Sequence, residues 1–425
     1  MDSKEYKDSV SKATSKWRFG INGLSKRNDI KEYSFNTNPL YDMVNYNTVE
    51  GVNATLKALY YKYSKETRQV KGLAAQAHYG FDNYKWSGAI SGFNLFNPKH
   101  GQRIAFSVGR YIEQFNAHQP ISPIFNTAYT LFDKSNYMKL YQKDMIEIKY
   151  RQELMNGLYG NIEASYQSRE ALLNHSYYYF AGGKYKHFTS NNPTTNDGAY
   201  SQTPSFEPDQ VLQFKVGFKF IPFAKYETYP TFKRLLATKW PEISAVYKKG
   251  ISTNSSLFNY DYLEVGIGKD INLRAIGEFK FDILAGAFFN NANMNFIDYK
   301  HFNGNQTLFL TNPPNTEIAG VTTRTPISEF HALNYYQYST NTKYIEYHVA
   351  HNFRGFFIGK IPLLRKTKFY EVAGINGLLT ETGSYNEVYV GFDKILQILR
   401  FDVGTAINGN AKVNLFYRIG LRLSF

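Results

Sequence analysis

Residues 411–425, AKVNLFYRIGLRLSF, alternate between apolar and polar side chains almost without interruption. Side chains along a β-strand point to opposite faces with a period of two. One face of this segment is therefore continuously apolar and ends on Phe425. The other face, interrupted by Phe416, carries Lys412, Asn414, Arg418, Arg422 and Ser424. A strand that crosses a bilayer between lipid and a wet lumen has this pattern over this length.

The composition excludes several classes of protein. Mean hydropathy is −0.44, and no stretch approaches the roughly 18–20 apolar residues of a membrane-spanning helix. The 36 Tyr and 34 Phe against 3 Trp fit pleated surfaces and interfacial girdles. The chain has no Cys, which excludes a disulfide framework and a thiolate metal site. The net charge of +14 is scattered through alternating segments rather than gathered in a tract, so we expect no nucleic-acid partner.

The alternation recurs along most of the chain and predicts fifteen strands. Many of these segments reach about 9–15 residues, the length a tilted membrane strand needs, whereas soluble strands typically have about 5–6. An open sheet of such strands would expose two edges, which closure removes. We therefore predict an all-β fold, a transmembrane antiparallel β-barrel. The segments are 52–60, 69–82, 85–96, 102–113, 146–153, 158–167, 212–220, 240–252, 257–269, 278–287, 343–353, 366–378, 385–393, 395–407 and the C-terminal run.

Loop lengths give a second line of argument. Three long connections, 114–141, 172–207 and 291–342, follow strands of one parity. Outer-membrane barrels place long loops outside and short turns on the periplasmic side. With both termini periplasmic, this parity needs one further strand before residue 46, around 17–22 or 29–35. The prediction is about 16 strands, with residues 1–45 as an N-terminal segment that holds the first strand and 46–425 as the barrel.

The polar faces of these strands would line the lumen, and they predict no enzyme. Among the motifs sought, no P-loop, zincin or nucleophile-elbow pattern is present. His348 and His351 are three residues apart in an alternating run, so they point to opposite faces and cannot both bind one metal ion. We expect no catalytic residue, metal or cofactor. The candidate lumen-facing residues are Arg400, Asp402, Arg418, Arg422, Glu278, Lys280 and Asp282.

The first residues, MDSKEYKDSVSK, are polar and contain no apolar core of a signal peptide. A barrel reaches the outer membrane only by export. We therefore expect a signal and other domains upstream of Met1.

Several segments near the C-terminus carry a resemblance to a known superfamily. In order they are HFNGNQT (301–307), KYIEYHVAHNF, GKIPLL, KFYEVAGINGLL, YNEVYVGFDK, LRFDVGTA and the terminal strand. This order resembles the outer-membrane barrel-assembly and two-partner-secretion superfamily of sixteen-stranded barrels. The resemblance implies an inward loop at His301, Phe302 and Gly304. It also implies a C-terminal assembly signal at Tyr417, Leu421, Leu423 and Phe425. The superfamily's Val-Arg-Gly-aromatic tetrad is missing from the loop, which sets this chain apart.

A closer resemblance spans about 45–425. It rests on YNTVEG (46–51), KSNYMKLYQKD (134–144), TKWPEI (238–243), HFNGNQT and FRGFFIGKIPLLRK (353–366). These phrases are similar to a Bacteroidetes-type family of outer-membrane barrels with no assigned activity. The resemblance implies that the barrel follows a carboxypeptidase-regulatory-like domain.

Together these observations predict a non-enzymatic protein of the cell outer membrane that acts in envelope biogenesis or transport. The expected partners are outer-membrane lipid and lipopolysaccharide, the barrel-assembly machinery that reads the C-terminal strand, and protein clients or a periplasmic domain. A porin-like passive channel for small solutes is the alternative. A barrel-embedded hydrolase would need a nucleophile beside a base, and the sequence offers no such pair.

Overall fold

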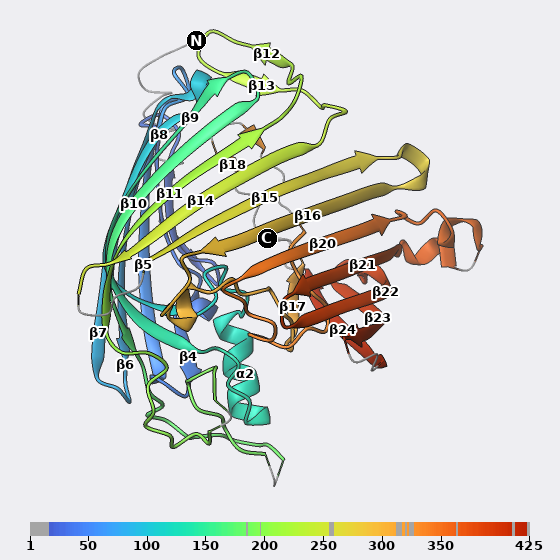
Figure 1. Cartoon of the computed structure of the whole chain (residues 1–425). Helices are drawn as coiled ribbons and strands as arrows, with labels where there is room; N and C mark the ends of the chain where they lie inside the picture. Colours follow the sequence, from blue (N-terminus) through green and yellow to red (C-terminus); the bar gives the residue numbers. More distant parts are fainter. Residues whose placement is uncertain are drawn as a thin grey trace.

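The computed structural model describes residues 17–183, 186–195, 197–254, 259–311, 317–318, 321–322, 327–362, 364–409 and 413–422. Most of the chain forms one curled sheet in which long neighbouring strands run antiparallel (Figure 1). All fifteen segments predicted from alternation are strands, with ends that differ by a few residues. They are β5 (Gly51–Tyr63), β6 (Val70–Gly80), β7 (Lys85–Asn97), β8 (Gln102–Gln114), β9 (Leu140–Met155), β10 (Leu158–Ala171), β11 (Asp209–Phe220), β14 (Glu242–Ser252), β15 (Asn259–Asn272), β16 (Glu278–Phe289), β20 (Lys343–Asn352), β21 (Tyr370–Thr380), β22 (Gly383–Ile395), β23 (Leu399–Asn408) and β24 (Val413–Arg422).

The strand expected before residue 46 exists, but it is split. β3 (Tyr33–Thr37) pairs with the second half of β5, and β4 (Val44–Asn47) pairs with its first four residues. Between them lies the 3₁₀ turn η1 (Leu40–Asp42), which begins after Pro39. Proline lacks the N–H that a continuous ladder requires, so the strand is interrupted there.

The sheet contains more strands than the sixteen predicted, because short ones join it. Within the described residues it has 20 strands, which include β1 (Arg18–Gly20) and β2 (Gly23–Asn28), two strands that continue from β3 as hairpins. They also include β17 (Phe309–Thr311), which pairs in parallel with β24. The N-terminal segment thus lies in the same sheet as the rest of the chain.

The three long connections all leave the same end of the sheet, here named the loop end. They follow β8, β10 and β16, as the parity argument requires, and the first contains the helix α2 (Pro123–Asp133). The opposite end, named the turn end, has tight connections such as 156–157. Two longer connections also leave the turn end. One carries the hairpin of β12 (Tyr226–Thr228) and β13 (Lys233–Leu235), and the other joins β20 to β21.

The remaining short elements lie in connections. They are η2 (Pro98–His100), η3 (Arg274–Ile276), η4 (Phe296–Asp298), η5 (Ile358–Lys360), η6 (Leu364–Thr367), β18 (Glu317–Ile318) and β19 (Val321–Thr322). Among the helices described, none has both the length and the apolar character needed to cross a membrane.

The outward-facing side chains of the curled sheet, at alternate positions of each strand, are largely apolar. Exposed fractions of 63% at Ile146, 41% at Ile283 and 77% at Leu415 show that this alternate set is left uncovered by the rest of the chain. The neighbouring inward side chains of the same strands are largely polar, for example Glu147 and Asp282, both buried. A water-soluble sheet would bury the apolar set instead, so this inverted arrangement is that of a membrane β-barrel wall.

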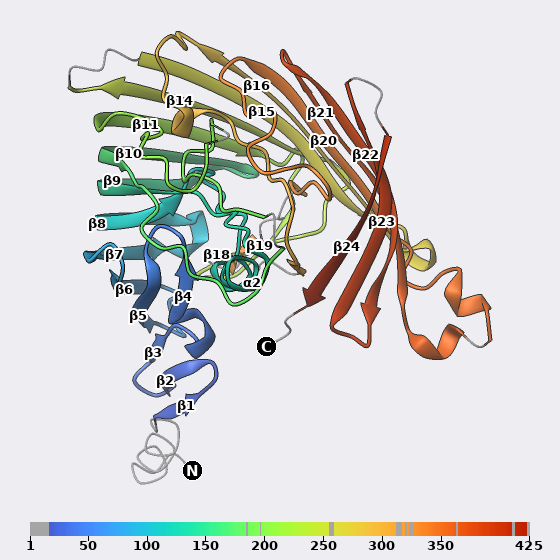
Figure 2. The same cartoon turned by 90° about the horizontal axis from the view of Figure 1, so that it is seen from below.

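The two edges of the sheet do not meet within the described part of the chain. β24 pairs with β23 along its length and with β17 at its last three residues, and no ladder joins it to β1, β2, β3 or β4. The expected closed ring is therefore not observed. Figure 2 shows the sheet curved around α2 and the long loops, with β24 and the N-terminal strands as its two edges.

Candidate functional site

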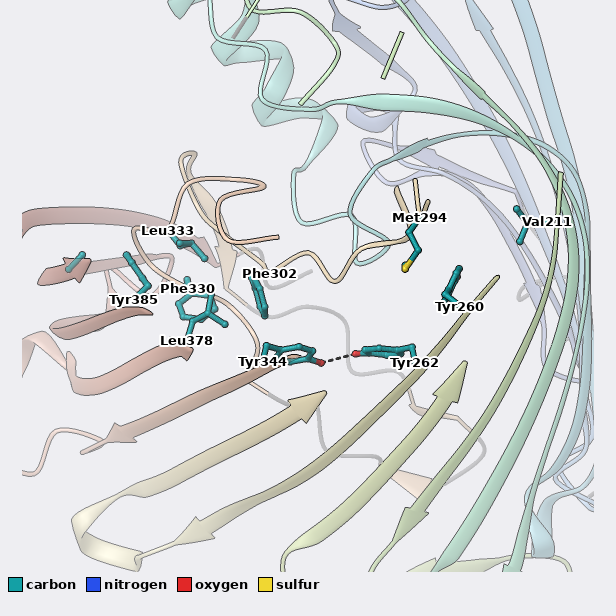
Figure 3. Packing of buried hydrophobic residues seen from close by; sticks show 11 residues of the cluster. Val211, Tyr260, Tyr262, Met294, Phe302, Phe330, Leu333, Tyr344, Leu378 and Tyr385 are labelled. Atoms are coloured by element: carbon teal, nitrogen blue, oxygen red, sulfur yellow. Dashed lines mark hydrogen bonds between the residues drawn. The ribbon is translucent and has the colours of Figure 1, made fainter. Parts of the chain in front are cut away.

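The long connection between β16 and β20 enters the concave side of the sheet and fills its C-terminal half. The described parts of residues 290–342, named the inner loop from here on, supply Met294, Phe302, Phe330 and Leu333 to the largest buried apolar cluster. In Figure 3 these side chains lie against residues of the surrounding strands, such as Tyr385. The lumen in this half is a packed core.

A buried arginine anchors the start of the inner loop. Arg169 on β10 donates to both carboxylate oxygens of Asp298, at 2.9 Å each, and to Asp209 of β11 at 2.7 and 2.6 Å. Tyr260 of β15 donates to Asp298 at 3.0 Å, and Asn295 donates to Asp209 at 2.6 Å. Burial alone would raise the pKa of Asp298, but the charge and hydrogen bonds of Arg169 hold it below its ordinary value.

A buried lysine makes the next anchor. The Lys300 ammonium of the inner loop lies 2.9 Å from Glu264 on β15 and 3.6 Å from Glu346 on β20. Burial would lower the pKa of Lys300, but the carboxylates of Glu346 and Glu264 raise it above its ordinary value, so the ammonium stays charged. The hydroxyls of Tyr262 and Tyr344 are 2.7 Å apart beside this pair, and the dashed line of Figure 3 joins them.

A third anchor holds the backbone of the inner loop. Glu387 of β22 is fully buried and accepts hydrogen bonds from the backbone N–H groups of His331 at 2.5 Å and Ala332 at 3.0 Å. Its remaining lone pairs accept from Asn376 at 2.6 Å and Tyr385 at 2.8 Å. A buried carboxylate with four donors is satisfied, which makes it a rigid attachment point.

The predicted lumen residues of the last two strands form a fourth anchor. Asp402 is fully buried between Arg400, 3.0 Å away, and Arg418, 3.4 Å away. Arg418 in turn lies 3.4 Å from Glu329 of the inner loop, and the ring of His331 lies 3.6 Å from Asp402. The predicted pair on β23 is thus part of a network that includes the loop.

The predicted residues of β16 also face inward. Asp282 is buried and accepts a hydrogen bond of 2.8 Å from the backbone N–H of Ile327 in the inner loop. Lys280 lies nearer the turn end, 3.2 Å from Asp270 and 3.5 Å from Glu278. Two of these three residues therefore neutralise each other on the wall, and one reaches the loop.

The inner-loop residues expected from HFNGNQT lie inside the sheet. His301 and Phe302 are buried, and a Cβ at Gly304 would lie 2.4 Å from the carbonyl oxygen of Leu333, so only glycine fits there. His301 Nδ1 lies 2.8 Å from the hydroxyl of Ser339. Burial lowers the pKa of His301 to about 3, which makes it a neutral packing residue.

The residues expected to form the C-terminal assembly signal are only partly described. Tyr417 is 77% exposed on the outer face, and Leu421 lies in β24. Leu423 and Phe425 lie outside the described residues. Arg422 pairs through its backbone with Thr311 of β17.

The two histidines of the HxxH pattern point in opposite directions. His348 is fully buried, 3.0 Å from Glu346 and 2.9 Å from Asn376. His351 lies 2.9 Å from the carbonyl oxygen of Ile276 at the turn end. The two imidazole rings therefore do not point toward a common ligand.

Sequence reasoning missed Arg169, Asp298, Lys300, Glu346 and Glu387. The strand residues of this set sit at inward positions of alternating runs, so parity alone would have found them. The loop residues carry no such signal.

The segment YNTVEG (46–51) forms the turn between β4 and β5. The side-chain oxygen of Asn47 accepts from the backbone N–H groups of Val49 and Glu50, each at 2.9 Å, and Glu50 lies 2.5 Å from His78 of β6. Gly51 has φ of +66°, where other residues are strained. A protein-family sequence model described as "Family of unknown function (DUF5686) C-terminal domain" matches residues 19–392. The chain belongs to this family.

This DUF5686 C-terminal domain is also similar to solved barrels, at low identity. BamA from Haemophilus ducreyi lacking POTRA domains 1–3 is 8% identical, with a TM-score of 0.42 over 97% of this chain and 76% of that one. A mutant porin of Rhodopseudomonas blastica is 8% identical, with a TM-score of 0.32 over 87% of this chain and 90% of that one. No curated protein matches.

Proposed function

We propose that this DUF5686 C-terminal domain is a non-enzymatic outer-membrane protein that acts in envelope biogenesis by pairing a client strand with the edge of β24. The observation that carries the proposal is the edge itself. Along Val413–Ile419, the side of β24 away from β23 has no ladder partner among the described residues. Unpaired backbone groups are costly in a bilayer, so this edge needs a strand beside it.

The packed C-terminal half of the lumen supports biogenesis over passive transport. Four anchors, at Arg169, Lys300, Glu387 and the Asp402 network, tie the inner loop to strands from β10 to β24. A porin-like channel needs a continuous aqueous path, which a loop held by buried charge pairs obstructs. Strand addition needs no such path, because affinity comes from main-chain hydrogen bonds and selection from alternate side chains.

The outer face supports the membrane location. Its alternate apolar residues extend over all the long strands, and the polar alternates face the lumen. Such a surface in water would be an aggregation hazard, whereas in a bilayer it is satisfied by lipid.

Cysteine crosslinking tests the pairing directly, because the native chain has no Cys. Single-cysteine variants at Leu415 and Tyr417 would be mixed, in detergent micelles, with a peptide of residues 413–425 that carries one cysteine. The matched control is Ile146→Cys, on β9, a strand paired on both sides. We expect a disulfide adduct at position 415 or 417 and none at position 146.

Two outcomes would contradict the proposal. One is the absence of an adduct from every β24 position at all peptide registers. The other is a stable, open-pore conductance in planar bilayers, which would favour the passive channel.

A further inference from the structure

Two arginines oppose each other on the lumen wall, away from the inner loop. Arg103 of β8 and Arg151 of β9 are direct cross-strand partners near the turn end of the sheet. Both occupy inward positions of their strands and are half-buried. Like charges directly opposite each other destabilise a sheet, so this pair requires a compensating anion.

No carboxylate of the described residues supplies that compensation. Besides each other, Arg103 has Tyr61 as a titratable neighbour and Arg151 has Tyr159. Lys57, Lys149 and Glu147 line the same depression as Arg103. The Nε atom of Arg103 is buried and has no hydrogen-bond partner in the described part of the chain.

The inward carboxylates nearest to them on β9 are already engaged. Glu153 pairs with Lys233 at 2.5 Å and accepts from Tyr226 at 2.6 Å. Glu147 pairs with Lys149 at 2.9 Å. Lys149 is also 3.3 Å from Glu163, and neither Glu147 nor Glu153 pairs with either guanidinium group.

Aromatic rings hold both guanidinium groups in place. The Arg103 guanidinium carbon lies 3.9 Å from the centroid of the Phe93 ring. That ring covers Gly72, where a Cβ would lie 2.3 Å from its edge. Arg151 lies 5.6 Å from the centroid of the Tyr159 ring. Stacking fixes the plane of a guanidinium and leaves its N–H edge for a ligand.

The wall beside Arg103 is hollowed. Arg103 lines a depression of about 300 Å³ together with the charged side chains of Lys57, Lys149 and Glu147 and with small residues such as Ala74 and Ser91, whereas Arg151 lies outside this lining. This volume is at the lower end of the roughly 300–1,000 Å³ typical of small-ligand sites. A ligand reaching Arg103 would therefore have room.

We propose that the depression lined by Arg103, Lys57 and Lys149, with Arg151 on the neighbouring strand, is a binding site for a phosphate group on the lumen wall. A phosphate carries about −1.5 to −2 charges at neutral pH, which matches two guanidinium groups, and arginine binds it through paired N–H donors. A phosphorylated solute offers such a phosphate as a monoester, and a phospholipid headgroup offers the same phosphate oxygens as a diester with a single negative charge. The site is independent of the β24 edge.

Chemical protection tests the site in the whole chain. The protein, in phosphate-free detergent micelles, is treated with phenylglyoxal, and modified arginines are identified by mass spectrometry. Inorganic phosphate is the solute probe, and phosphatidylglycerol doped into the micelles is the lipid probe. We expect at least one probe to reduce modification of Arg103 and Arg151 several-fold, while Arg110, paired with Asp144 on the outer face, is unaffected.

The two arms identify the source. Protection by inorganic phosphate indicates a solute, and protection by phosphatidylglycerol alone indicates a lipid headgroup. Absence of protection by both probes would overturn the proposal.

Variants separate charge from geometry. Arg103→Gln is expected to abolish the probe-induced rise in melting temperature, and to raise the melting temperature in probe-free buffer by removing the repulsion. Gly72→Ala keeps every charge but displaces Phe93, so probe affinity should fall about tenfold. Arg110→Gln is the matched control and should bind the probe as the native chain does. Equal probe binding by Arg103→Gln and the native chain would also overturn the proposal.

Discussion

Arg169 and Asp298 face each other through two hydrogen bonds of 2.9 Å, although 129 positions separate them in the sequence. Arg169 belongs to the wall and Asp298 to the inner loop. Both side chains are almost fully buried, so the contact fixes the loop at a point where water cannot compete. The loop is thus a structural part of the barrel wall's interior.

Removing this anchor should destabilise the protein. Arg169→Ala leaves the carboxylates of Asp209 and Asp298 buried without their main cation, and breaking a buried ion pair typically costs about 3–5 kcal/mol. The free energy of unfolding in detergent, measured by urea titration, should fall by that amount. Arg234→Ala, which breaks an exposed pair with Glu227 in the β12–β13 hairpin at the turn end, should cost about 0–1 kcal/mol. Equal effects of the two substitutions would contradict the anchoring role.

Glu387→Gln should loosen the middle of the inner loop. The substitution removes the charge that strengthens four hydrogen bonds, and bonds to charged groups contribute about 1.5–3 kcal/mol each. Hydrogen exchange should accelerate at the amides of His331 and Ala332, which donate to this carboxylate. Glu381→Gln, at an exposed pair with Lys343, is the control. Unchanged exchange at both amides would show that Glu387 does not hold the loop.

A charge placed on the outer face should be costly only if lipid covers that face. Ile283 lies in the middle of β16, outward and 41% exposed. Ile283→Arg should lower stability in lipid bilayers by about 2–4 kcal/mol, the cost at a bilayer midplane. Ile283→Val should change it by less than about 0.5 kcal/mol. If arginine is tolerated as well as valine, the face does not contact hydrocarbon.

His301 should make stability depend on pH in the acidic range. Burial lowers the pKa of His301 in the folded state to about 3, below the ordinary 6.5. Between these pH values the imidazole is protonated in the unfolded chain and neutral in the folded chain. Its contribution to stability is complete above pH 6.5 and is lost as pH falls toward 3, by at most about 1.4 kcal/mol per pH unit. His301→Asn should show a shallower acid loss in urea titrations. Parallel curves for the two proteins would contradict this assignment.

The walls of this fold could be predicted from the sequence, and its interior only in part. Period-two alternation located every long strand, and parity located the loop end and the missing first strand. It also placed Asp402 and Asp282 on the inner face. These assignments share one physical basis, since hydrocarbon on one side and a polar interior on the other impose the same local pattern on every strand.

The remaining features depend on contacts between distant segments. Asp298 and Lys300 lie in a loop without periodic pattern. Their ion-pair partners on the strands, such as Arg169 and Glu264, can be identified only in the folded structure. The break of the first strand at Pro39 was readable in principle, because proline cannot donate to a ladder. The pairing of β17 with β24 joins segments about a hundred residues apart, which alternation does not report.

The parallel pairing of β17 with β24 connects the C-terminal edge strand of the sheet to the inner loop. β17 is part of the inner loop, so a strand that took its place beside Gly420 and Leu421 would act on the same segment that the buried charges hold. Binding of a strand to the edge of β24 and ordering of the inner loop are then thermodynamically linked. Each process changes the free energy of the other by the same amount.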